Sequence, residues 1–275
     1  MRAARAAVAE AATATAPDRR PDPEGSVSGD RADGPERIER HARRVRWLHT
    51  ATYALTLALL FTGWWIALGG EGRPSPLARL SGIGDVSLHV WVGRALAALA
   101  VVVLVLGRRG LATFARESAR RDPGDGRWFL RWPWGASTGR FGRHEGRFDP
   151  GQRIANVVIV LGLVVLVVSG LWLTGVHGGP TFVWLNQVHR WTAIVLTVVL
   201  AGHLLIAFGF LPGYRGVWRA MHLGGRVRVD TARRVWPGWT ERELRRASPG
   251  SGTSVADARG PAGPDARPAR SRARP

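Results

Sequence analysis

Four histidines carry the chemistry that this sequence offers, and their spacing indicates what that chemistry is. His189 and His203 stand fourteen residues apart within one apolar run. Because an α-helix turns about 100° and rises about 1.5 Å per residue, both imidazoles lie on one helix face, about 21 Å apart along the axis. His49 and His89 begin two further apolar runs. Imidazoles bind haem iron, so four of them at two depths predict two haem b sites.

Composition limits the alternatives to this chemistry. The 275 residues include no Cys, which excludes disulfides, thiolate-bound iron–sulfur clusters, covalently attached c-type haem and Cys-based zinc sites. The formal net charge of +19 would indicate a nucleic-acid partner in a soluble protein. Here the arginines lie outside the apolar runs, so membrane topology explains the charge, and we expect no nucleic-acid partner.

The elements that must position these histidines are long apolar helices. About 20 residues of helix cross a hydrocarbon core of about 30 Å, and four runs reach that length. The fold class expected is therefore all-α, an integral membrane four-helix bundle. Gly63, Gly93, Gly170 and Gly202 would let a neighbouring backbone or a flat ligand come close, although ordinary helix packing explains them equally well. The four runs are approximately 47–68, 88–106, 154–173 and 183–210.

Arginine distribution predicts the orientation of the bundle. The segment between the second and third runs and both tails are rich in Arg, whereas the segment between the first and second runs has only Arg73 and Arg79, balanced by Glu71 and Asp85. The turn at 176–187 has neither Arg nor Lys. By the positive-inside rule, both termini and the middle segment are cytoplasmic. The chain is thus expected in the inner (cytoplasmic) membrane as a multi-pass protein.

The same patterns divide the chain into four parts. Residues 1–44 form an Ala/Arg/Pro-rich leader and residues 247–275 a tail, both expected to be disordered because they lack apolar residues for a core. Residues 45–210 form the four-helix di-haem domain. The basic cytoplasmic segment 211–246 interleaves Trp218, Trp236 and Trp239 with arginines, which suits anionic lipid at the membrane surface. A subunit contact or a quinone vestibule is the alternative for this segment.

Helix direction decides which histidines meet. His89 and His189 fall near the outer surface, while His49 and His203 fall nearer the cytoplasm, so each pair could supply both axial ligands of one haem. A histidine at a helix end can instead sit among lipid headgroups, which stays open for His49 and His89. His203 lies within an apolar run, where an ionisable group costs a few kcal/mol and is usually functional. The remaining histidines are expected at the surface: His41, His144, His177 and His222.

Several short motifs resemble those of one family. They are Trp47-Leu48-His49 after an arginine-rich entry, His89-Val-Trp-Val-Gly93, Phe148-Asp-Pro-Gly-Gln152, Gly224-Gly-Arg226 and Trp236-Pro-Gly-Trp239, together with the interval from His189 to His203. Over residues 43–246 the chain resembles the gamma subunit of respiratory formate dehydrogenase. That subunit is a four-helix di-haem cytochrome b related to the membrane cytochromes of nickel–iron hydrogenases. The resemblance implies the same histidine pairs, with His89 and His189 at the outer haem.

The resemblance also implies a quinone site beside the inner haem, formed by His203 and the turn before the third helix. The matching residues of that turn are Asp149, Gly151 and Gln152. Gln152 can donate and accept hydrogen bonds, and Gly151 allows close approach. Members of the family often carry Asn at the position of Asp149. A carboxylate there could deliver protons to a reduced quinone, or could cap the helix at its N-terminus.

Arg94 and Arg190 are candidates for binding the propionates of the outer haem. Arg pairs well with carboxylates in partly buried places, Arg190 adjoins His189, and Arg94 lies five residues after His89. The alternative is that both arginines snorkel to the headgroups or face a partner subunit.

The function expected is that of a membrane anchor and electron conduit. The resemblance implies a molybdenum or tungsten catalytic subunit and an iron–sulfur subunit that supply electrons, which leave through two b haems to menaquinone or ubiquinone. The chain alone would not act on formate. Three alternatives stay open: the cytochrome subunit of a nickel–iron hydrogenase or other molybdenum oxidoreductase, a stand-alone quinol-oxidising cytochrome b, and a scaffold without haem.

Overall fold

The computed structural model describes residues 36–69 and 72–247. Most of the leader and nearly all of the tail that the sequence predicts to be disordered, residues 1–35 and 248–275, lie outside the described residues. Residues 36–44, assigned to that leader from composition, contain strand β1 (Arg37–Glu39) and the start of the first long helix. Composition missed them because their order depends on pairing with a distant segment of the chain.

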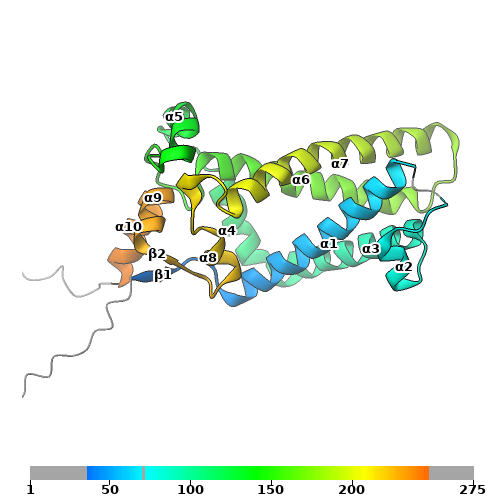
Figure 1. Ribbon diagram of the computed structural model, residues 1–275, viewed down its shortest axis with the longest axis horizontal. Helices are drawn as coiled ribbons and strands as arrows, with labels where there is room; N and C mark the ends of the chain where they lie inside the picture. Colours follow the sequence, from blue (N-terminus) through cyan, green and yellow to red (C-terminus); the bar gives the residue numbers. More distant parts are fainter. Residues whose placement is uncertain (1–35, 70–71, 248–275) are drawn as a thin grey trace, which may run out of the picture. The chain divides into compact units, whose positions relative to one another are not determined.

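Among the described residues, four helices are long and apolar enough to cross a membrane, which confirms the predicted all-α membrane fold. Helix α1 packs against α3, α6 packs against α7, and α3 also contacts α6 (Figure 1). Large apolar side chains such as Trp91, Val105 and Trp184 point outward from them, as lipid-facing residues do. The helices are α1 (Arg43–Ala67), α3 (Asp85–Leu106), α6 (Pro150–Leu173) and α7 (Gly179–Ala207).

These helices begin earlier than the apolar runs in the sequence. Helix α1 starts at Arg43 and α6 at Pro150, in each case four residues before its run. The reason is that hydropathy reports the part of a helix inside the hydrocarbon, whereas the helix itself extends to its capping residue. Asp149 is that residue for α6, since its carboxylate accepts a hydrogen bond from the Gln152 backbone N–H at 2.8 Å.

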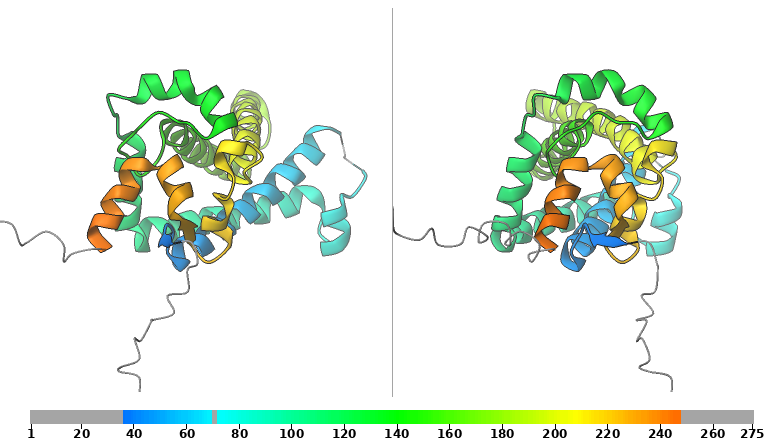
Figure 2. Two further views of the ribbon diagram at one scale, coloured as in Figure 1. Left: turned by 60° about the vertical axis from the view of Figure 1, so that its left-hand side comes forward. Right: turned by 90° about the vertical axis from the view of Figure 1, so that its left-hand side faces the viewer.

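The other described segments gather mostly at one end of the bundle, where α1 and α6 begin and α3 and α7 end (Figure 2). We call residues 36–42, 107–149 and 208–247 the basic cap. The short helix α2 (Pro76–Ser81) lies at the opposite end. The basic cap contains β1, α4 (Arg108–Ala119), α5 (Asp125–Thr138), η1 (Pro212–Tyr214), α8 (Trp218–His222), β2 (Arg226–Arg228), α9 (Val229–Val235) and α10 (Pro237–Ala247).

An apolar core of its own holds the basic cap together. Tyr214, Trp236 and Trp239 are buried in it, with exposed fractions of 2%, 3% and 4%. The Arg40 guanidinium lies over both tryptophan rings, 4.1 and 4.3 Å from their centres. For these two tryptophans the structure therefore shows protein contact. A lipid contact for the rest of segment 211–246, including the half-buried Trp218, stays a prediction.

A buried ion-pair cluster ties the basic cap to α6. Arg153 is 3% exposed and donates hydrogen bonds to Asp125 at 2.8 Å and to Asp122 at 3.2 Å. Asp122 also accepts from Arg120 at 2.8 Å and from the Gly146 backbone N–H at 3.2 Å. The turn between α4 and α5 is thereby fixed to the first turns of a membrane helix.

Candidate functional site

The first histidine pair joins α3 to α7 at the end of the bundle opposite the basic cap. The ring centres of His89 and His189 lie 6.2 Å apart. Both side chains are half-buried. We call these two residues the His89 pair.

The second pair joins α1 to α7 nearer the basic cap. The ring centres of His49 and His203 lie 6.4 Å apart, and both residues are half-buried. We call them the His49 pair. Helix α7 thus contributes one imidazole to each pair, and the structure brings together the partners that helix direction predicts.

The spacing within each pair suits one metal ion between two imidazoles. A bond from imidazole nitrogen to a transition metal is about 2 Å long and that nitrogen lies about 1 Å from the ring centre, so two rings on opposite sides of one metal ion have centres about 6 Å apart. The 6.2 and 6.4 Å found here match that value. Two neutral nitrogen donors without thiolate or carboxylate are the axial set of a b-type haem, so these residues fit the cofactor.

Two hydroxyl groups complete the surroundings of the His89 pair, and the sequence did not single them out. Thr62 Oγ1 lies 2.9 Å from His89 Nδ1, and Ser169 Oγ lies 2.9 Å from His189 Nδ1. Both hydroxyl residues are buried, with exposed fractions of 0% and 4%. A sequence signal exists, because each is followed by glycine near the end of a membrane helix.

The glycines that follow these hydroxyls make room for the rings. A Cβ at Gly63 would lie 3.2 Å from His89 Cε1, and a Cβ at Gly170 would lie 3.2 Å from His189 Cε1. By contrast, a Cβ at Gly93 would meet only Leu59 at 3.8 Å, and one at Gly202 would meet no described atom within 4 Å. Two of the four glycines therefore permit close approach of an imidazole.

A third imidazole adjoins the His49 pair. The His222 ring centre lies 6.4 Å from that of His49 and 5.9 Å from that of Tyr53, and its plane is 6° from that of Phe208. His222 is exposed, as expected. Its neighbours were not predicted, because α8 turns back toward α1 and the sequence gives no sign of this return.

The expectation for His144 was wrong. This residue is 1% exposed, and its Nε2 lies 2.9 Å from the Val235 carbonyl oxygen. It was assigned to the surface because its segment is basic, but α9 and α10 cover that segment. His177 is exposed and His41 is half-buried.

The turn before α6 holds the residues expected at a quinone site. Asp149 is 5% exposed and caps α6, and a Cβ at Gly151 would lie 2.9 Å from Trp128 Cη2. Burial raises the pKa of Asp149 above its usual range, against the opposing hydrogen bond from Gln152 and the nearby positive charges. Within residues 36–69 and 72–247, His203 makes no hydrogen bond or aromatic contact with this turn. A shared quinone site stays a prediction.

The two arginines proposed for haem propionates are exposed near the His89 pair. Arg94 Cζ lies 5.0 Å from the centre of the Trp91 ring. Neither Arg94 nor Arg190 forms an ion pair with a described residue. Their role toward a carboxylate ligand stays a prediction.

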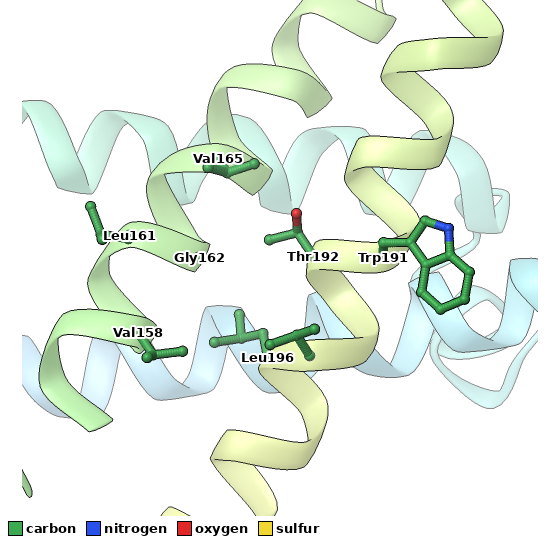
Figure 3. Close-up of a pocket in the computed structure, with 8 residues that line it drawn as sticks. Val158, Leu161, Gly162, Val165, Trp191, Thr192 and Leu196 are labelled. Carbon is green, nitrogen blue, oxygen red and sulfur yellow. The ribbon is translucent and has the colours of Figure 1, made fainter. Parts of the chain in front are cut away.

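An apolar groove of 390 Å³ opens between α6 and α7 (Figure 3). Thr192 and Leu196 of α7 point toward α6 there, and Gly162 on α6 has no side chain to fill the groove. Thr192 donates its hydroxyl hydrogen to the Val188 carbonyl at 2.7 Å, inside its own helix. The groove therefore suits an apolar chain better than a polar headgroup.

Comparison with known proteins gives one positive finding. A family model described as prokaryotic cytochrome b561 matches residues 40–224, which include both histidine pairs and all four long helices. No curated protein matches the chain.

Proposed function

Because this chain belongs to the prokaryotic cytochrome b561 family and is therefore a membrane b-type cytochrome of electron transfer, we propose that it is the cytochrome b subunit of a formate dehydrogenase complex. In this role it anchors the complex and carries electrons from an iron–sulfur subunit to the quinone pool. The observation that carries the proposal is the presence of two histidine pairs at two depths of one bundle, joined by α7.

Each pair has a separate task in this proposal. A b haem between two imidazoles would supply a one-electron carrier, and one at each pair would provide two carriers at two depths of the bundle. The His89 pair binds and orients one haem and the His49 pair the other, while the apolar helices keep water away. Arg94 and Arg190 are proposed to bind propionates of the haem at the His89 pair.

Orientation follows from the basic cap. Arginines are concentrated there and are sparse around α2, so we place the basic cap in the cytoplasm and the His89 pair near the outer surface. The iron–sulfur subunit, and through it the molybdenum or tungsten catalytic subunit, then contacts the end of the bundle that carries α2.

The quinone is proposed to bind near the His49 pair. His203, Asp149, Gly151 and Gln152 are the residues assigned to it from the family resemblance. A quinone that takes up two electrons also takes up two protons, and a buried carboxyl whose pKa is raised is suited to supply one. To supply the proton, Asp149 must either break its hydrogen bond with the Gln152 backbone N–H or transfer the proton from its other carboxyl oxygen.

Two other functions fit the same residues. A nickel–iron hydrogenase or another molybdenum oxidoreductase would use the same anchor with a different partner. A stand-alone quinol-oxidising cytochrome b would use the same two histidine pairs without a partner subunit. Copurification separates a subunit of a complex from a stand-alone cytochrome, since only the former retains an iron–sulfur subunit after mild extraction, and the identity of the copurified catalytic subunit separates the complexes from one another.

The test of the proposed function is a haem count on the purified chain with its partners removed. We expect two b haems per polypeptide in a reduced-minus-oxidised spectrum. Substitution of alanine for one histidine of either pair should remove one haem and leave the other. The exposed His177 lies in the turn between α6 and α7, so His177→Ala serves as the control and should keep both.

Three results would contradict this assignment. A chain without haem, a chain with one haem, or a chain whose four single variants all keep two haems would each overturn it.

His222→Ala should keep both haems. If it loses one while His203→Ala keeps both, His222 replaces His203 as the partner of His49.

A further inference from the structure

We propose that Thr62 and Ser169 are positioning residues that hold the imidazoles of the His89 pair in the tautomer that binds haem iron. The proposal rests on the proposed function in one respect, that the His89 pair holds a haem. It adds two residues and a hydrogen-bond direction that neither the family match nor the helix pattern supplies.

The direction of the hydrogen bond follows from the single hydrogen of the Thr62 hydroxyl. Thr62 Oγ1 donates that hydrogen to the Ala58 carbonyl at 2.9 Å, one turn earlier in α1. Toward His89 it can therefore only accept, so the hydrogen of the 2.9 Å contact belongs to His89 Nδ1. The lone pair of this neutral imidazole is then on Nε2, where it is free to bind iron.

Ser169 repeats the arrangement in the other half of the bundle. Its Oγ donates to the Val165 carbonyl at 2.6 Å, one turn earlier in α6. Toward His189 Nδ1, which is 2.9 Å away, it can therefore only accept. Both imidazoles of the pair are thereby hydrogen-bonded at Nδ1, which leaves their Nε2 atoms free.

The recurrence argues against coincidence. Ser and Thr in membrane helices commonly donate to the carbonyl four residues earlier, as Thr52 and Thr192 do here, with no hydrogen bond to an imidazole among the described residues. Thr62 and Ser169 differ because each meets a ring of the same pair and is followed by a glycine that leaves space for that ring. The sequence carries the repeat as well, since both His89 and His189 precede a tryptophan by two residues.

The two histidine pairs differ in the hydrogen bonding of their Nδ1 atoms. His49 Nδ1 is buried and has no hydrogen-bond partner among residues 36–69 and 72–247. A hydrogen bond from Nδ1–H makes an imidazole a more basic ligand, and a more basic ligand stabilises ferric over ferrous iron. The hydroxyls should therefore lower the midpoint potential at the His89 pair.

The experiment removes one hydroxyl at a time from the full chain. In Thr62→Val and in Ser169→Ala we expect the midpoint potential of one haem to rise while that of the other is unchanged, in an optical redox titration. The double variant should bind the affected haem about 10- to 100-fold more weakly. Thr192→Val is the matched control, since it removes a back-bonded hydroxyl of α7 for which the described residues show no hydrogen bond to an imidazole, and it should change neither potential.

Conservative variants keep the test decisive if the double variant loses its haem or fails to fold. Thr62→Ser and Ser169→Thr retain the hydroxyls and should restore both the haem content and the wild-type potential. The proposal is overturned if the single variants leave both potentials unchanged, shift both equally, or match the control. A wild-type chain without two haems contradicts the proposed function instead, so the two failures are distinguishable.

Discussion

Gly63 and Gly170 leave the space in which the rings of the His89 pair stand. Each lies beside the hydroxyl residue that contacts the same ring, so one dipeptide supplies both a hydrogen-bond partner and room. An added methyl group 3.2 Å from Cε1 is closer than ordinary van der Waals contact, and either the ring or the helix must move. Metal ligands tolerate such movement poorly because binding requires a narrow range of distances and angles.

We therefore expect Gly63→Ala and Gly170→Ala to lower haem occupancy at the His89 pair. The loss should be about half of the total haem, with the haem at the His49 pair retained. Gly202→Ala is the matched control, because no described atom lies within 4 Å of the added carbon. A haem count with redox spectra checks this, and equal occupancy in all three variants would contradict it.

The residues that the sequence identifies and those that it misses differ for a physical reason. His189 and His203 could be predicted as a unit because one helix fixes their relation. Thr62 and Ser169 could not, since their contacts with His89 and His189 depend on how neighbouring helices are rotated. No periodicity within a single helix records that rotation.

At the scale of the elements, the first turns of α6 connect the membrane bundle to the basic cap. Asp149 caps this helix, and Arg153 binds the turn between α4 and α5. Burial alone would raise the pKa of Asp122, but the hydrogen bond from Arg120 and the charges of Arg120 and Arg153 lower it below its usual range. Charge on Asp122 therefore stabilises the attachment.

The stability of the basic cap should depend on pH through Asp122. Because its pKa is lower in the folded than in the unfolded chain, its contribution is complete above the ordinary Asp pKa of about 4 and is lost as pH falls through the lowered value. Asp122→Asn should lower the free energy of unfolding by about 1–3 kcal/mol at pH 7 and weaken this acid dependence. Unfolding of the basic cap, followed by tryptophan fluorescence from pH 7 down to about pH 2, covers both the ordinary and the lowered pKa of this carboxyl and measures both effects.

A matched variant exists on the surface of the same region. Asp230 pairs with Arg228 at 2.9 Å, but both side chains are exposed. Asp230→Asn should leave the stability nearly unchanged, since exposed ion pairs contribute little. If the two variants behave alike, the burial of the Asp122 cluster does not matter for stability.

The four long helices could be predicted from length and hydropathy alone, because crossing a membrane imposes both. The basic cap could not be predicted. Its core joins Tyr214, Trp236 and Trp239 to residues of α5 and to the strand at Arg37–Glu39, and these segments lie far apart in the sequence. Basic composition indicated lipid there, while the two tryptophans instead pack within the protein.

For the whole molecule, an even number of membrane crossings places the basic cap and both flanks of the described chain on one side. We expect a fluorescent reporter fused after residue 247 to fold in the cytoplasm and to be active. Alkaline phosphatase inserted between α1 and α2 should be active only outside the cytoplasm, as arginine distribution predicts. The same two reporters in exchanged positions provide the control, and the reverse pattern of activities would show that the bundle is inverted.

The pairing of β1 with β2 has a consequence for biosynthesis. Arg37–Glu39 leaves the ribosome before any membrane helix, whereas its partner Arg226–Arg228 is made only after the last one. The two strands can therefore pair only after α7, the last of the four long helices of the described chain, has been synthesised. A nascent chain stalled before residue 226 would therefore carry β1 unpaired, so pairing of the two strands follows synthesis of the whole bundle.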